Sequence, residues 1–327
     1  MTITLTPLMG PVVQDTADAT GMPRFGAWLV RYRWPAVGAF LAVSVVASIV
    51  FSVPERQYLW IWLVVLAVLV GAYNPHPIAQ VVIDWLPVLI ILAGYDFVRS
   101  FADELVPRAV IEPQLRFDEI VFGGTVPTVL FQDWFDVRNK PHPWDYLIFC
   151  VYLSHFVVTP CFAIYLYLRD RPRFRRFAMV ILTVSLAGFV TYFILPAAPP
   201  WYASEKGDLE PTIRVAQRVW ESLGVSGAAD AFAGRNTNVA NPVAALPSLH
   251  AAWPFLMLLF VWRRAPRGRW LALAYNAAMV FVLVYGAEHY VSDVLLGWLY
   301  AVVIFLVVSR ILDHHSAATA KPISPPR

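Results

Sequence analysis

Two histidines and an aspartate, which lie in two separate segments, have the types and spacing for nucleophilic and proton-transfer chemistry. His289 and Asp293 lie four residues apart in "EHYVSD" (288–293), a spacing that places both side chains on one face of a helix. A carboxylate that accepts a hydrogen bond from one imidazole nitrogen fixes the tautomer and makes the other nitrogen more nucleophilic. His250, in "LPSLHAAW" (246–253), supplies a second imidazole that can work as an acid or a base.

The segment around His250 also offers a place for an anion. Ser248 precedes an apolar run, so its hydroxyl and the following backbone N–H groups lie at the expected start of a helix, where negative charge is favoured. Together with His289 and Asp293, this arrangement predicts phosphoryl transfer through a phosphohistidine. The sequence contains no His, Cys, Asp and Glu cluster with ligand spacing, so we expect neither a metal nor another cofactor.

Each of these features also has a structural interpretation. A histidine at a membrane interface is usually solvated, and His289 with Asp293 alone could be a structural hydrogen bond. The segment "LPAAPPWY" (195–202) alone is typical of a turn followed by an interfacial aromatic anchor. The functional interpretation rests on the combination, because three distant segments place these residues at the same depth. His155 stays open, since its distance from the others cannot be obtained from the sequence.

The elements that must position these residues are membrane helices. Of 327 residues, 59% are hydrophobic and 14% are charged, whereas about a quarter of a soluble domain is charged. A bilayer span needs about 20 mostly apolar residues. We predict an all-α polytopic bundle of about eight spans, with a six-helix catalytic core. The predicted spans are 35–53, 58–73, 78–98, 144–168, 177–195, 246–262, 270–287 and 290–312.

Three arginine-rich segments set the expected orientation, since Lys and Arg in short loops mark the cytoplasmic side. These are 24–33, 169–176 and 263–269. With eight spans they share one face with both termini, and the more acidic loops 99–143 and 196–245 lie outside. We therefore expect a bacterial-type plasma membrane protein with an extracytoplasmic site. Nucleic acid is excluded as a partner, because topology explains the basic clusters.

The same pattern predicts the organisation of the chain. Loop 99–143 mixes apolar and acidic residues, a pattern that fits one or two amphipathic helices on the membrane surface and equally a simple structural cap. The expected segments are a disordered, basic cytoplasmic N-terminus at 1–34, three spans within 35–98, the extracytoplasmic loop 99–143, a catalytic core at 144–312 and a disordered cytoplasmic tail at 313–327.

The motifs "PSLH" and "HYVSD" resemble the second and third signature motifs of the lipid phosphate phosphatase superfamily, the type 2 phosphatidic acid phosphatases. The resemblance covers roughly 90–312. It implies that His289 is the nucleophile, that Asp293 orients it and that His250 protonates the leaving oxygen. The phosphatase branch usually carries Lys and Arg-Pro in its first motif and Ser-Arg before the nucleophile. Those cations are missing here.

The segments "PPWY" and "PSLHAAWPF" and the Arg-less "HYxxD" look instead like the inositol phosphorylceramide synthases and bacterial inositol phosphotransferases. "FDEIVFGG" (117–124) and "YLSHFVVTP" (152–160) also resemble that branch. Another cation must then neutralise the phosphate. The expected substrate- and phosphate-binding residues are Arg235, Arg99, Lys206, Ser248, Pro200, Trp201, Tyr202 and Tyr290.

The resemblance implies a metal-independent phosphotransferase that moves a phospho-alcohol head group, phosphoinositol in the first instance, from a phospholipid donor to a lipid or glycolipid hydroxyl. Two alternatives remain. The same three residues would serve a phosphatase of polyprenyl or diacylglycerol phosphate, although the missing cations count against it. A lipid transporter or scaffold that kept the fold without catalysis would tolerate the loss of His289.

Overall fold

The computed structural model describes residue 39 and residues 78–135, 141–225 and 241–319. The chain divides into two units, Met1–Ile78 and Ala79–Arg327, and the architecture below is that of the second. Apart from residue 39, the predicted spans 35–53 and 58–73 lie outside the described residues, as does Arg235.

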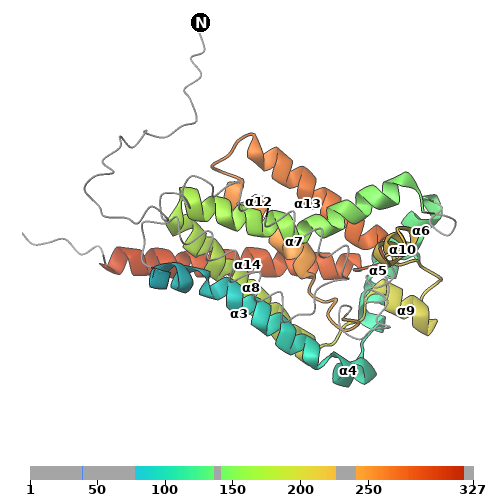
Figure 1. Ribbon diagram of the computed structural model, residues 1–327. Coiled ribbons are helices and arrows are strands. Elements are labelled where there is room, and N and C mark those ends of the chain that lie inside the picture. The colour runs from blue at the N-terminus through green and yellow to red at the C-terminus, as the bar shows by residue number, and fades with distance from the viewer. Residues whose placement is uncertain (1–38, 40–77, 136–140, 226–240, 320–327) are drawn as a thin grey trace, which may run out of the picture. The chain divides into compact units, whose positions relative to one another are not determined.

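Long helices dominate the described part of the chain, as the sequence predicts (Figure 1). They are α3 (Ile78–Ser100), α7 (Pro143–Arg169), α8 (Arg171–Ile194), α12 (Leu249–Val261), α13 (Gly268–Tyr285) and α14 (Val291–Thr319). Among the described helices, α7, α8, α13 and α14 are long and apolar enough to cross a membrane, whereas α3 and α12 contain shorter apolar stretches. The prediction of eight spans with a six-helix core therefore stays a prediction.

Helix α12 is central to the packing, because it contacts α7, α8, α13 and α14. Two glycines allow close approach to the start of α12. A Cβ atom at Gly188 of α8 would lie 3.1 Å from the Leu249 side chain. At Gly297 of α14, a Cβ atom would overlap the carbonyl oxygen of Ser248. The small residue at position 297 thus lets α14 contact the backbone just before His250.

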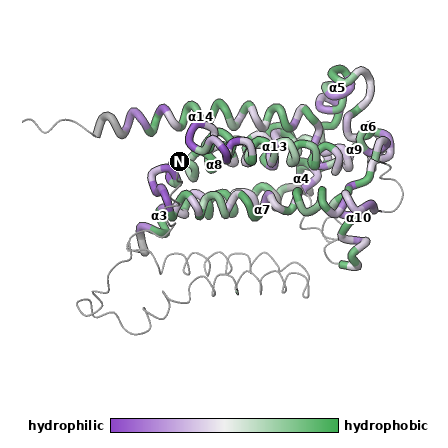
Figure 2. Tube along the Cα trace, turned by 90° about the horizontal axis from the view of Figure 1, so that it is seen from above, coloured by the Kyte–Doolittle hydropathy of each residue, from purple (hydrophilic) through white to green (hydrophobic). Residues whose placement is uncertain are grey.

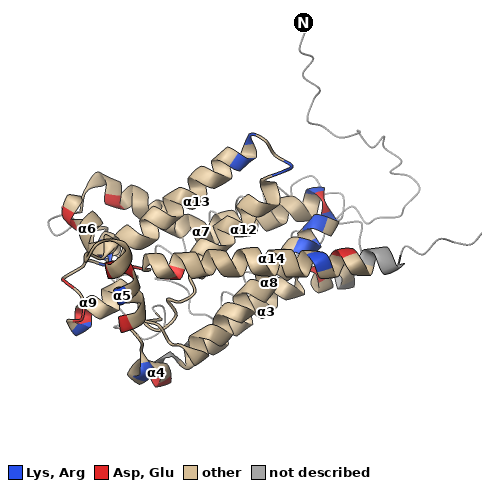
Figure 3. Ribbon diagram, turned by 180° about the vertical axis from the view of Figure 1, so that it is seen from behind, with Lys and Arg blue, Asp and Glu red and all other residues tan. Residues whose placement is uncertain are grey.

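Arginines hold one end of the bundle together. Asp84 of α3 is buried and pairs with Arg171 at 2.5 Å and Arg175 at 2.8 Å. From the same turn, Arg173 donates to the Phe260 carbonyl of α12, and Arg176 pairs with Asp313 of α14. Figure 3 shows that Lys and Arg gather mainly at this end, whereas Asp and Glu are found mainly near α5, α6 and α9 at the other. This distribution agrees with the charge asymmetry of the loops.

Short helices form the other end of the unit. The segment 99–143 contains α4 (Ala102–Leu105), the 3-10 helix η1 (Val106–Arg108), α5 (Glu112–Val121) and α6 (Pro127–Trp134). After α8 come α9 (Pro200–Lys206) and α10 (Val215–Ser222). Among the described residues there is no strand, but isolated bridges join Val110 to Ala197 and Ala197 to Ala244. These bridges tie the loops before α5, α9 and α12 to one another.

The last helix is longer than the sequence indicates. The predicted span ends at 312 and a disordered tail was expected from 313, but α14 continues to Thr319. Figure 2 shows the physical difference along this helix, whose apolar residues give way to hydrophilic ones near its C-terminal end. The Arg176–Asp313 pair fixes part of that polar extension to α8.

Candidate active site

His289 and Asp293 are in contact, but helical spacing is not the reason. Helix α13 ends at Tyr285, and α14 begins only at Val291, so His289 lies in the intervening turn. His289 Nδ1 lies 3.3 Å from Asp293 Oδ2, which also accepts the backbone N–H of Tyr290 at 2.9 Å. Because Asp293 faces Nδ1, Nε2 is the imidazole nitrogen available for attack. Both side chains are buried.

The turn before His289 has an unusual backbone. The Glu288 and His289 N–H groups both donate to the Leu283 carbonyl, at 3.0 and 3.2 Å. Ala287 has a φ of 62°, which is unfavourable for a residue with a Cβ atom. Its carbonyl accepts the Trp201 N–H at 3.1 Å. Local strain of this kind persists only where the surroundings fix it, and here the start of α9 does so.

A distant carboxylate caps the helix that carries Asp293. Asp118 of α5 accepts the Val291 N–H through Oδ2 at 2.9 Å and the Ser292 N–H through Oδ1 at 3.1 Å. Its side chain is fully buried. Burial raises the pKa of Asp118 to about 6, although the two backbone hydrogen bonds act in the opposite direction. The "FDEIVFGG" segment therefore reaches the site through this aspartate.

His250 is the second residue of α12 and lies opposite His289. Ser248 is the N-cap of this helix, and its hydroxyl accepts the Ala251 N–H at 3.2 Å. The Ser248 N–H donates to the Asp293 carbonyl at 3.0 Å, which directly joins the segment that carries His250 to the one that carries His289. The His250 and His289 ring centroids are 5.7 Å apart. The structure thus brings together the three residues that the sequence selects.

A third histidine lies behind His250. His155 of α7 is buried, with its ring centroid 4.5 Å from that of His250, and it stacks on Trp253 at 4.9 Å. The Tyr152 ring, also from α7, stacks on His250 at 5.4 Å. Among the described residues, His155 Nδ1 and His250 Nε2 have no hydrogen-bond partner. The open question about His155 is answered: it belongs to the same cluster.

Sequence reasoning missed an arginine and a glutamate beside His289. Arg214 donates through Nε and Nη2 to the two carboxylate oxygens of Glu288, at 2.8 and 2.9 Å. Its guanidinium also lies over the Trp201 ring, 4.6 Å from the centroid. Burial alone would lower the pKa of Arg214, but the Glu288 carboxylate outweighs this and raises it. In the sequence, the one sign of this Arg214–Glu288 ion pair is that Glu288 directly precedes His289.

The substrate-binding residues chosen from the sequence fall into different environments. Trp201 is buried beneath Arg214, and Pro200 begins α9. Tyr202 is half-buried and lies beneath the ammonium of Lys206, which is exposed at the end of α9. Tyr290 is buried against Val126 and Val129.

Two of the predicted phosphate-binding cations have no described side chain. Arg99 lies in α3, but its side chain is outside the described part, as is the whole of Arg235. Within the described ranges, no group of three or more His, Cys, Asp and Glu side chains is arranged to hold a metal ion.

Comparison with known proteins adds independent information. A family model described as "PAP2 superfamily" matches residues 126–307. The phosphoinositol dihydroceramide synthase of Bacteroides thetaiotaomicron is 32% identical over 237 residues, which cover 68% of this chain and 74% of that protein. No solved structure matches the chain significantly.

Two fungal proteins are also similar. The inositol phosphorylceramide synthase of Candida albicans is 25% identical over 69% of this chain and 48% of its own length. The catalytic subunit of inositol phosphorylceramide synthase from Schizosaccharomyces pombe is 28% identical over 39% of this chain and 31% of its own length. These matches agree with the branch that "PPWY" and "PSLHAAWPF" indicate.

Proposed function

Since the chain belongs to the PAP2 superfamily and is an integral membrane enzyme acting on lipid phosphates, we propose that it transfers phosphoinositol from phosphatidylinositol to a hydroxyl group of a lipid or glycolipid. The names of the three relatives support the head group. The observation that carries the proposal is the cluster of His289, Asp293 and His250, in which one imidazole faces a carboxylate and another lies across from it.

In the first step, His289 Nε2 attacks phosphorus and forms a P–N bond. The bond between phosphorus and the diacylglycerol oxygen breaks, and protonated His250 gives its proton to that oxygen, so diacylglycerol leaves. Asp293 accepts the Nδ1 hydrogen bond of His289 and stabilises the positive charge that develops on the ring. Phosphoinositol is then held on His289 as a phosphohistidine.

In the second step, the acceptor replaces His289 on phosphorus. Its hydroxyl gives its proton to His250, its oxygen attacks, and the P–N bond breaks with return of the electron pair to His289. His250 is again protonated and ready for the next donor. Water would give hydrolysis by the same route, so exclusion of water from the buried cluster favours transfer.

Arg214 is our candidate for neutralising the phosphate. It is a buried cation that contacts Trp201 of "PPWY" and the residue next to His289. Charge-assisted hydrogen bonds from arginine to phosphate are strong and geometrically specific. Lys206, Arg99 and Arg235 remain candidates for outer contacts. From the arginine distribution at the opposite end, we place the site at the extracytoplasmic face, with both termini in the cytoplasm.

The test uses purified protein in detergent, head-group-labelled phosphatidylinositol and a lipid extract from the host. We expect label in a new lipid, with loss of that product in His289→Ala. His314→Ala, at an exposed histidine near the C-terminal end of α14, is the matched control and should keep full activity. Activity should persist in excess chelator. Label released only as a water-soluble phosphate would instead identify a hydrolase, and activity in His289→Ala would reject the mechanism.

A further inference from the structure

Arg214 and Glu288 form a buried ion pair beside the histidine cluster. Both side chains are 9% exposed, and the guanidinium donates to both carboxylate oxygens. A buried ion pair costs desolvation energy for each partner, which only good geometry and further contacts offset. Here the pair lies directly beside the proposed nucleophile, since Glu288 and His289 are consecutive residues.

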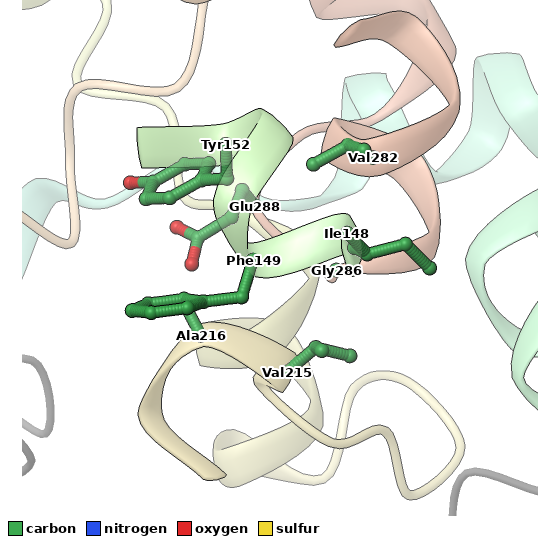
Figure 4. A pocket seen from close by; sticks show the side chains of 8 residues that line it. All are labelled: Ile148, Phe149, Tyr152, Val215, Ala216, Val282, Gly286 and Glu288. Atoms are coloured by element: carbon green, nitrogen blue, oxygen red, sulfur yellow. The ribbon is translucent and has the colours of Figure 1, made fainter. Parts of the chain in front are cut away.

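Glu288 also faces a small cavity. The described residues that line it come from α7, α10, α13 and the turn after α13; Glu288 is charged, and the others are apolar, aromatic or glycine. Figure 4 shows the carboxylate between the rings of Tyr152 and Phe149. In such surroundings little water is available to screen the charge, so the carboxylate affects a nearby anion strongly.

The net charge of the pair determines which phosphate it suits. A phosphate monoester carries about −1.5 to −2 charges at neutral pH, whereas a phosphodiester carries one. An arginine alone offers a full positive charge to either anion. When a carboxylate is paired with that arginine, the attraction is reduced, and the reduction is larger for the more highly charged monoester.

We propose that Glu288 is a specificity-determining residue that, by holding Arg214 in a neutral pair beside His289, selects phosphodiester donors over phosphate monoesters. This inference rests on the proposed function, because it concerns the donor of that same site. It explains in physical terms how a chain with the phosphatase motifs favours head-group transfer over dephosphorylation. The phosphatase branch adds cations, which make the site more positive. This chain adds a carboxylate, which makes the site less positive.

The first experiment compares two reactions in Glu288→Gln and in the unmodified protein. Turnover of labelled phosphatidylinositol reports the diester, and phosphate release from phosphatidic acid reports the monoester. Glu288→Gln keeps the shape and removes the negative charge, so the monoester-to-diester ratio should rise about tenfold or more. Glu221→Gln, an exposed glutamate on neighbouring α10, is the matched control and should leave the ratio unchanged.

A double variant separates charge from shape. Arg214→Gln with Glu288→Gln restores the net charge of the unmodified pair, so its ratio should return toward the original value although total turnover falls. An unchanged ratio in folded Glu288→Gln would overturn the inference. If the unmodified protein transfers no phosphoinositol at all, the proposed function fails instead, and the two failures are thus distinct.

A second measurement needs no variant and applies even if Glu288→Gln does not fold. Phosphatidic acid and its monomethyl ester, phosphatidylmethanol, share the same lipid and differ in phosphate charge. At pH 8 we expect the monomethyl ester to inhibit phosphatidylinositol turnover by the unmodified protein about tenfold better. Equal or stronger inhibition by phosphatidic acid would reject selection by charge.

Discussion

Asp293 has two contacts through one oxygen, and both bear on the proposed reaction. Asp293 Oδ2 faces His289 Nδ1 and also accepts the Tyr290 N–H, so it orients the imidazole and fixes the backbone between them. Asp293 Oδ1 is buried without a hydrogen-bond partner among the described residues. A buried carboxylate oxygen without a partner costs free energy, which fits the role proposed for Asp293 in orienting His289.

Replacing Asp293 with Asn should therefore impair catalysis more than folding. The amide keeps the size of the side chain but can present its NH₂ group to the imidazole, which favours the wrong tautomer. We expect the transfer rate to fall roughly 10³-fold, within the range known for such substitutions. Detergent-stability measurements should show a much smaller change. A variant that unfolds would indicate a mainly structural role.

Asp118 predicts a pH dependence of activity. Both of its oxygens accept backbone N–H groups at the start of α14, so a proton on either oxygen removes an acceptor. With its pKa raised to about 6, the carboxylate ionises as the pH rises through 6. The α14 cap then forms fully, and transfer activity should rise over the same range. A pH–rate profile of Asp118→Asn should lack this limb.

Stability should change with pH in the opposite direction. The folded protein binds the Asp118 proton more tightly than the unfolded chain, whose pKa is the ordinary 3.8. This group's contribution to the free energy of unfolding is therefore largest below 3.8 and is lost as the pH rises to about 6. If activity and stability both decrease at low pH in the unmodified protein and in Asp118→Asn alike, another group controls the pH profile.

Helices α5 and α6 support the site as well as covering one end of the bundle. Asp118 of α5 caps α14, and Gln132 of α6 connects two backbone segments. Gln132 Nε2 donates to the Ile213 and Tyr285 carbonyls at 2.8 and 2.7 Å, and its Oε1 accepts the Ile213 N–H at 2.8 Å. It thereby holds the residue before Arg214 next to the end of α13.

Gln132→Ala should loosen that connection. Three buried or half-buried backbone groups would lose their partner, and each such loss costs about 1–3 kcal/mol. We expect a lower melting temperature and reduced transfer, since Arg214 and Glu288 lie on the two segments that Gln132 joins. Gln217→Ala, which removes an exposed hydrogen bond to Glu221 on α10, is the control and should change neither.

The contact between α14 and α12 depends on Gly297. A methyl group there would overlap the Ser248 carbonyl, so Gly297→Ala must move α14 away from the start of α12. Overpacking of this kind costs about 1–3 kcal/mol, and it separates the segments that carry His289 and His250. Transfer should fall more than about tenfold. Leu299→Ala, an exposed position on the same helix, should have little effect in the same assay.

Across the whole molecule, the sequence predicted the residues whose signal is local. Hydropathy located the long helices, although α8 begins at Arg171 rather than at 177 and α14 continues to Thr319 rather than ending at 312. The motifs selected His250, His289 and Asp293, which the structure brings together. Asp118, Gln132 and Arg214 were missed as parts of the site because their partners are more than 70 residues away in the sequence. Those contacts depend on how the loops fold at the end of the bundle, which periodicity and composition do not specify.

The distribution of charge along the molecule also predicts its orientation in the membrane. Arg263, Arg264, Arg267 and Arg269 follow α12 at the end opposite the site, and basic loops stay in the cytoplasm. In a background with Cys150 and Cys161 replaced by Ser, a cysteine at exposed Glu210 should react with a membrane-impermeant maleimide in intact cells. A cysteine at exposed Arg264 should react only after permeabilisation. Because the two positions lie at opposite ends of the bundle, the reverse pattern would place the histidine cluster in the cytoplasm and require the donor lipid in the inner leaflet.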